Sequence, residues 1–198
     1  MDDRGREDDT EPADTASGRA ILLCAPSESL TRHDACLDLL VPTDGDAVDV
    51  LCVSLSGDPV DHLEAIRSQG VDVARTALAS VGADRGVDED LDRSFSVESL
   101  ETVDQLSDLG MYVREVLEDW AASDAPSVVC FDSVDDLLER ADLDLVFEFL
   151  LVFVEGIRPW DPTAHFHFDP DEHDGTTRRT LAHLFDDVVD VDGDAPVG

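Results

Sequence analysis

The residues best suited to chemistry lie between His165 and His173, where the chain reads HFHFDPDEH. Because successive side chains of a strand point to opposite faces, His165, His167 and Asp169 would share one face of a strand. Imidazole and carboxylate groups are ligands of zinc and iron, so these three residues are candidates for a metal site. The same pattern also fits half-buried strand residues followed by a turn and a helix cap. We expect this second arrangement, with no bound metal, and keep the three side chains as candidates.

The chain contains no lysine, since all 13 basic residues are arginine. This absence excludes the lysine of an ordinary Walker A phosphate loop, and it excludes Schiff-base and pyridoxal chemistry, which need a lysine amine. The four cysteines, Cys24, Cys36, Cys52 and Cys130, form no CxxC pair. Three of them lie in apolar runs, so we expect small buried side chains with reduced thiols.

Charge dominates the composition: 48 acidic residues against 13 basic ones give a formal net charge of -35. Such a surface repels phosphate groups, which argues against nucleic acid and anionic membranes as partners. An acidic excess without lysine or asparagine is typical of proteins that work in multimolar salt, where the Debye length falls to about 3 Å at 1 M. The sequence therefore predicts a protein of a salt-in halophile.

No hydrophobic segment predicts export or a membrane span. Residues 1–19 contain no apolar run, so we expect no signal peptide and a cytoplasmic location. The longest apolar stretch, Leu145 to Ile157, is shorter than the roughly 20 residues of a transmembrane helix, and two glutamates interrupt it.

Apolar runs of strand length alternate with helical patterns, and these elements must position the candidate residues. Strands are predicted at residues 20–24, 49–55, 73–78, 127–131, 164–168 and 188–191, and helices at 34–40, 59–69, 103–122, from 133, 142–157 and 173–185. Continuous apolar strands are typical of a parallel sheet buried on both faces. The sequence predicts an α/β three-layer sandwich with a mainly parallel central sheet, in a single domain over residues 19–192. Residues 1–18 are predicted to be a disordered acidic tail, 193–198 a flexible end, and 80–94 a mobile loop.

In an open parallel α/β sheet, ligands bind beyond the carboxyl ends of the strands. The first strand-to-helix turn, residues 25–31, reads APSESLT and has no glycine that would let the backbone approach a phosphate. It matches neither the GxGxxG fingerprint nor the GxxxxGK[ST] loop. We therefore expect no nucleotide or dinucleotide cofactor.

The order of these parts resembles the RecA/KaiC-like branch of the P-loop ATPases over nearly all of residues 19–191. The run VDVLCVSLSGDPVDHLEAIRSQGVDV, residues 48–73, resembles the second strand, the helix and the following strand entry of that branch. The run VVCFDSVDDLLE, residues 128–139, resembles its Walker B strand. The resemblance implies that Asp132, with Ser133 beside it, stands where the family uses an aspartate to hold the nucleotide's magnesium.

The departures from the family pattern concern the catalytic groups. Residues 21–40 stand where the family has its phosphate loop, yet they lack its glycines and its lysine. After the second strand, where the family has its catalytic glutamate, the chain has only the run SLSG, residues 54–57, with Asp58 slightly displaced. The resemblance thus implies a pseudo-ATPase, similar to an uncharacterised haloarchaeal group of degenerate RecA-like domains. For Asp132 an alternative is a structural role as the N-cap of the helix that follows.

The helix predicted at residues 142–157 is apolar around most of its circumference. Such a helix either lies deep between the sheet and other helices or presents one side to another chain. We expect one edge to be covered by a second copy or by a different protein, with Phe149 and Phe153 as the interface residues.

Two functions from different classes follow from these observations. The first is a non-catalytic RecA/KaiC-like regulatory or scaffolding protein, not an enzyme, which acts through a protein partner or as a homo-oligomer. The alternative is a metal-dependent hydrolase that uses His165, His167 and Asp169.

Overall fold

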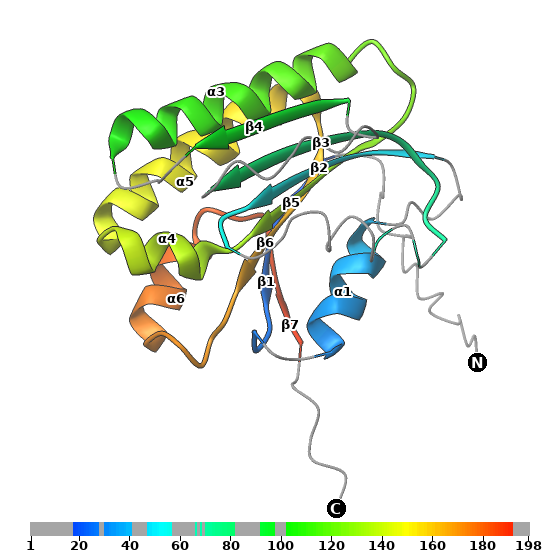
Figure 1. Ribbon diagram of the computed structural model, residues 1–198. Coiled ribbons are helices and arrows are strands. Elements are labelled where there is room, and N and C mark those ends of the chain that lie inside the picture. The colour runs from blue at the N-terminus through cyan, green and yellow to red at the C-terminus, as the bar shows by residue number, and fades with distance from the viewer. Residues whose placement is uncertain are drawn as a thin grey trace, which may run out of the picture.

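The computed structural model describes residues 18–27, 30–40, 47–56, 66, 68, 70–81, 92–97 and 102–191. They form a seven-stranded sheet in the order β4-β3-β2-β5-β6-β1-β7, with every neighbouring pair parallel (Figure 1). The strands are β1 (Ala20–Cys24), β2 (Val48–Ser54), β3 (Val73–Val81), β4 (Arg93–Val97), β5 (Ser127–Asp132), β6 (Thr163–Phe168) and β7 (Asp187–Asp190). The helices are α1 (Leu30–Leu40), α3 (Val103–Trp120), α4 (Val134–Arg140), α5 (Leu143–Ile157), α6 (Gly175–Ala182) and the 3-10 helix η1 (Arg158–Trp160). The predicted α/β architecture with a parallel central sheet is confirmed.

Helices lie on both faces of the sheet, which makes three layers (Figure 1). On one face, α3 and α5 pack with sheet residues such as Phe131 and Phe166 in one buried cluster. On the other face, Cys36 of α1 belongs to a second cluster with Leu23 and Cys130. Because side chains alternate along a strand, the two histidines of β6 lie on the α1 side of the sheet, opposite to Phe166.

Side-chain caps start the helices that follow the sheet. Thr102 accepts a hydrogen bond from the backbone N–H of Gln105, whose side chain accepts from the N–H of Thr102, so the two form a capping box at α3. Ser133 caps α4 by accepting from the N–H of Asp136 at 3.2 Å. The alternative that Asp132 is the N-cap is therefore wrong. Asp132 is the last residue of β5, and its carboxylate accepts a hydrogen bond from Arg32.

Strand β4 differs from the prediction of a mobile loop at residues 80–94. Both ends of that segment are in strands, β3 and β4, which pair in parallel from Ala77 and Arg93 onward. Phe95 of β4 stacks on Tyr112 of α3, with 5.0 Å between the ring centroids. As an edge strand, RSFSV buries little of its length and lacks the continuous apolar run that identified the other strands. Residues 82–91, most of the predicted helix 59–69, and nearly all of the predicted terminal segments lie outside the described residues.

The apolar helix α5 is both a core element and a surface element. Val146, Leu150, Phe153 and Val154 are buried, and the ring of Phe153 meets that of Phe131 edge-on at 5.5 Å. Its outer edge carries Val152, which is 73% exposed. Within the described part of the chain, no helix is long and apolar enough to cross a membrane.

Candidate functional site at the carboxyl edge of the sheet

The carboxyl ends of β5, β6 and β1 lie side by side, and Arg32 from the first turn of α1 reaches across them. Its Nε donates to Nδ1 of His167 over 2.8 Å, and its Nη2 donates to Oδ1 of Asp132. Its Nη1 also reaches the carbonyl oxygen of Ser27 at 3.4 Å. The guanidinium, with its side chain 14% exposed, thus occupies the edge where an open α/β sheet usually binds its ligand.

Asp169 follows the end of β6 and organises the turn after β1. Its Oδ2 accepts from the backbone N–H of Ser27 at 2.5 Å, and its Oδ1 accepts from the N–H of Asp171 at 2.9 Å. Burial opposes ionisation of this carboxyl, but these hydrogen bonds and the charge of Arg32 outweigh it and hold the pKa of Asp169 below its ordinary value. Asp169 therefore has a structural task as a carboxylate.

Asp135 in the first turn of α4 is a second buried carboxyl at this edge. Both its oxygens accept from the backbone N–H of Asp169 at 3.0 Å, and Oδ1 lies 2.9 Å from Nε2 of His173. Burial raises the pKa of Asp135 to about 6, against the opposing effects of these partners. Asp135, Glu172 and His173 have ligand atoms within 4.8 Å of one another, with Glu172 exposed.

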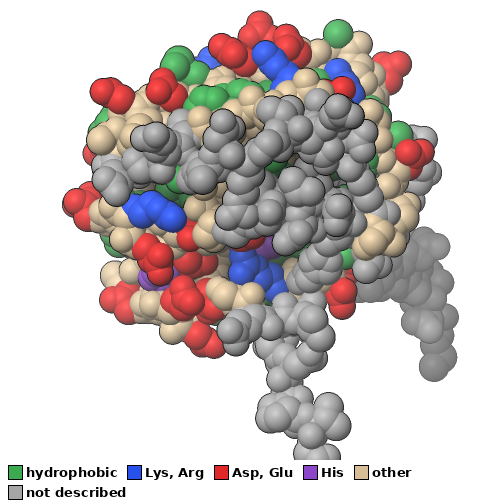
Figure 2. Space-filling view, in the orientation of Figure 1, with side chains coloured by type: hydrophobic (Ala, Val, Ile, Leu, Met, Phe, Trp, Pro, Cys, Tyr) green, Lys and Arg blue, Asp and Glu red, His purple; other side chains and the backbone are tan. Residues whose placement is uncertain are grey.

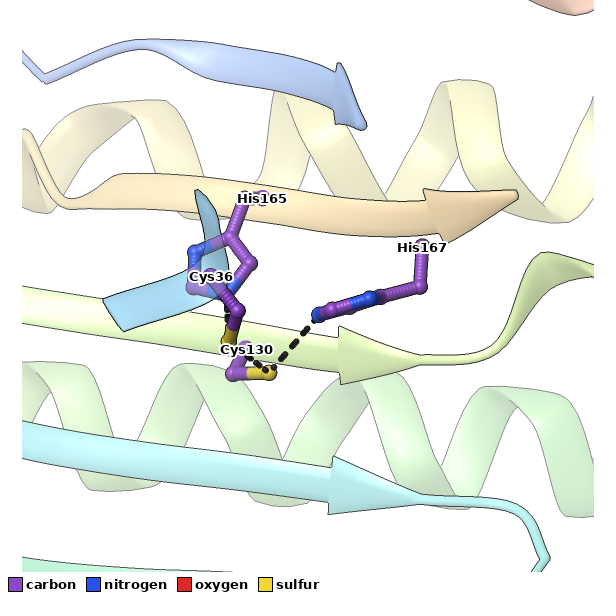
Figure 3. Close-up of side chains that lie close together, drawn as sticks. All are labelled: Cys36, Cys130, His165 and His167. Carbon is purple, nitrogen blue, oxygen red and sulfur yellow. Dashed lines mark hydrogen bonds between the residues drawn. The ribbon is translucent and has the colours of Figure 1, made fainter. Parts of the chain in front are cut away.

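Beneath Arg32, four potential metal ligands meet between the sheet and α1 (Figure 3). They are Cys36 of α1, Cys130 of β5, and His165 and His167 of β6, and all four are buried. The Cys36 sulfur lies 3.8 Å from that of Cys130 and 3.2 Å from Nε2 of His165. The Cys130 sulfur lies 3.4 Å from Nε2 of His167. The strand register explains the meeting, because Cys130 and His165 are direct partners in the pairing of β5 with β6.

The two thiols of this cluster differ in acidity. The hydrogen bond from Cys130 stabilises the Cys36 thiolate, with help from His165, and lowers the pKa of Cys36 well below its ordinary value despite burial. The same hydrogen bond, together with burial, raises the pKa of Cys130 well above the ordinary value. Burial also lowers the pKa of His167. Of the two thiols, Cys36 is therefore the more readily ionised.

The structure brings together only part of the metal set suggested by the sequence. His165 and His167 share a face, as the period of two predicts. Asp169, however, is directed to the Ser27 turn, and the residues that join the histidines are Cys36 and Cys130. The four cysteines are buried thiols, as expected, but the prediction that they act only as small hydrophobes missed two potential ligands. The spacing between Cys36 and Cys130, 94 residues, carries no motif, so the sequence signal was absent.

A second surface feature lies between the helices α3 and α5. It is a groove of about 310 Å³ lined by Val103, Leu106, Ser107, Gly110, Met111, Arg114, Leu145, Glu148, Phe149, Val152 and Phe153. Met111 and Val152 are more than half exposed at 54% and 73%. Both residues predicted for an interface line this groove, Phe149 half-buried and Phe153 buried beneath it.

Comparisons with solved structures identify the fold. PH0321, an uncharacterised protein from Pyrococcus horikoshii solved in complex with an unknown peptide, has a TM-score of 0.63 at 15% identity, covering 88% of this chain and 77% of that one. The KaiC-like protein PH0186 from Pyrococcus horikoshii OT3 has a TM-score of 0.56 at 13% identity, with 89% and 73% covered. PH0250, from the same organism, has a TM-score of 0.58 at 8% identity, with 89% and 83% covered. The RecA/KaiC-like fold suggested by the sequence is confirmed.

No curated protein matches the sequence. A family model does match it, over residues 18–191, which span all the strands and helices given above. This range holds the Arg32 site, the buried cysteine and histidine cluster and the α3–α5 groove. The chain belongs to DUF7504, a family of unknown function.

Proposed function

We propose that this protein is a non-catalytic, RecA/KaiC-like regulatory or scaffolding protein that acts through protein contacts. The observation that carries the proposal is the position of Arg32, whose guanidinium joins Asp132 to His167 at the carboxyl edge of the sheet. Asp132 is the residue that the resemblance equates with the magnesium-binding aspartate of the ATPases. In this chain the carboxylate of Asp132 is already paired with Arg32 of the same protein.

The charges at this edge also disfavour a triphosphate. Asp132, Asp135 and Asp169 lie around it, whereas Arg32 is already committed to two side-chain partners. Phosphoryl transfer depends almost wholly on positioning and on positive charge that stabilises the transferred group. A site with several carboxylates, no lysine and no glycine in its first turn supplies neither.

We predict that the dissociation constant of the protein for ATP lies in the millimolar range or above. Calorimetry in molar potassium chloride with magnesium measures this directly. A micromolar dissociation constant would overturn the non-catalytic assignment, and its loss in Asp132→Asn would place the nucleotide at the magnesium position of the ATPases.

Two observations support contact with another protein. The α3–α5 groove exposes apolar side chains, Met111 and Val152 among them, which would be covered favourably by an apolar segment of a partner. The similar structure of PH0321 was solved with a peptide bound to it. The hydrolase alternative has less support, because His165 and His167 are 0% and 2% exposed, whereas catalytic zinc sites keep one position open to substrate.

We predict that Met111→Glu and Val152→Glu reduce recovery of a specific partner by about tenfold or more, since each places a charge in the groove. The measurement is a quantitative pull-down in molar salt, with light scattering to detect a second copy of the chain. Leu151→Glu is the matched control, because Leu151 is 44% exposed on the same helix but does not line the groove. Equal recovery with all three variants would place the contact elsewhere.

A further inference from the structure

We propose that Cys36, Cys130, His165 and His167 form a closed tetrahedral binding site for a zinc-type metal ion, which links α1 to β5 and β6. This assignment does not depend on the proposed regulatory function. It also differs from the hydrolase hypothesis, because two cysteines replace Asp169 and the site offers no open position for a substrate.

Three distances among the four ligand atoms are close to those of a tetrahedral zinc site. With Zn–S bonds of about 2.3 Å and Zn–N bonds of about 2.0 to 2.1 Å, a tetrahedron separates two sulfurs by about 3.8 Å and a sulfur from a nitrogen by about 3.6 Å. The Cys36 and Cys130 sulfurs are 3.8 Å apart, and the two sulfur to nitrogen distances are 3.2 and 3.4 Å. All four ligand atoms lie within 4.8 Å of one another, so one ion can reach them together.

The chemistry and burial of the ligands define the class of metal. Two thiols and two imidazoles are the Cys2His2 set of structural zinc sites, whereas Mg²⁺ and Ca²⁺ prefer oxygen. The surrounding layer is apolar, with Leu23, Leu37 and Cys52 in the same buried cluster. In such a layer an unpaired polar atom is costly, yet Nδ1 of His165 has no hydrogen-bond partner among the described residues. Of the two ring nitrogens of His165, Nε2 faces the Cys36 sulfur and is therefore the ligand atom.

Arg32 links the metal site to the carboxyl edge of the sheet. Because its Nε donates to Nδ1 of His167, the neutral imidazole carries its proton on Nε2, which faces Cys130. Coordination through Nε2 requires that proton to move to Nδ1, and two N–H groups would then oppose each other. Metal binding through His167 therefore requires Arg32 to withdraw from the imidazole, and Asp132 remains as its partner. The ion and the Arg32–His167 hydrogen bond exclude each other.

The test is titration of the reduced, metal-free protein with Co²⁺ and then Zn²⁺ in molar potassium chloride. We expect about one Co²⁺ per chain with tetrahedral visible absorption and thiolate-to-cobalt charge transfer, and displacement of the cobalt by zinc. Cys36→Ser and Cys130→Ser should each weaken binding by at least about tenfold. Cys52→Ser is the matched control, because Cys52 is buried in the same layer but is not one of the four ligands, and its affinity should be unchanged. Arg32→Met should bind about tenfold more tightly, since the competing hydrogen bond is removed.

The acidic surface makes one further outcome important. Cobalt bound only by exposed carboxylates, or by Asp135, Glu172 and His173, would show no thiolate charge transfer, and that result would overturn the proposal. The proposal would also be overturned if folded Cys52→Ser lost as much cobalt affinity as Cys36→Ser and Cys130→Ser do. If a cysteine variant fails to fold, the intensity of the charge-transfer band of the wild-type protein still tests the site. An intensity that corresponds to two thiolates supports the proposal, and the absence of the band refutes it.

Discussion

Transfer of the purified protein from molar potassium chloride to about 10 mM salt is expected to unfold it, because the Debye length then grows to about 30 Å. Thirteen arginines cannot neutralise 48 acidic residues, which leaves a net charge of -35 on a chain of 198 residues. Acidic side chains are spread over the visible surface with few arginines between them (Figure 2). Without screening, their mutual repulsion acts across the whole molecule and opposes the compact state.

Circular dichroism during dialysis measures this effect, and recovery of the native spectrum is expected when the salt returns. A neutral solute such as sucrose at matched osmolarity is the control for general exclusion from the protein surface. We expect it to restore much less structure than potassium chloride does. Full native structure at low salt would show that the fold tolerates its own charge, and the proposed origin in a salt-in halophile would lose its physical basis.

Arg75→Met is expected to destabilise the protein by about 3 to 5 kcal/mol, because it leaves a buried carboxylate without its partner. Asp49 of β2 is fully buried, at 0% exposed. Arg75 of β3 donates from Nε to its Oδ1 at 2.9 Å and from Nη2 to its Oδ2. The same guanidinium donates to the carbonyl oxygen of Trp120 at 3.1 Å and lies over its ring, with Cζ 5.3 Å from the centroid.

Urea unfolding in molar salt, followed by tryptophan fluorescence, measures the loss. Arg93→Met is the matched control, since Arg93 pairs with Asp119 on the surface and such pairs contribute about 1 kcal/mol or less. Adding Asp49→Leu to Arg75→Met should recover most of the stability, because it removes the uncompensated charge. A loss for Arg75→Met no larger than that for Arg93→Met would mean that Asp49 reaches solvent or another partner.

The architecture of the sheet could be predicted because its signals are local. The apolar strand runs and the alternating helical patterns lie within short segments, so β1, β2, β5 and β6 were located to within a residue or two. The edge strand β4 was missed because an exposed edge needs no continuous apolar run, even though its partner β3 is the strand that precedes it in the chain.

The candidate site could likewise be predicted only in part from the sequence. The period of two in HFHFD is a property of the sequence alone, and it put His165 and His167 on one side of β6. What lies opposite them was decided by the tertiary structure, because the order of the strands sets Cys130 beside His165, and the packing of α1 on the sheet adds Cys36 and Arg32. Asp169 had the correct period but lies past the end of β6, where the chain turns and backbone N–H groups compete for its carboxylate. Residue types and local periods are properties of the sequence and can be recognised in it directly. Contacts between segments some 100 residues apart, such as that of Arg32 with Asp132, form only when the sheet has formed.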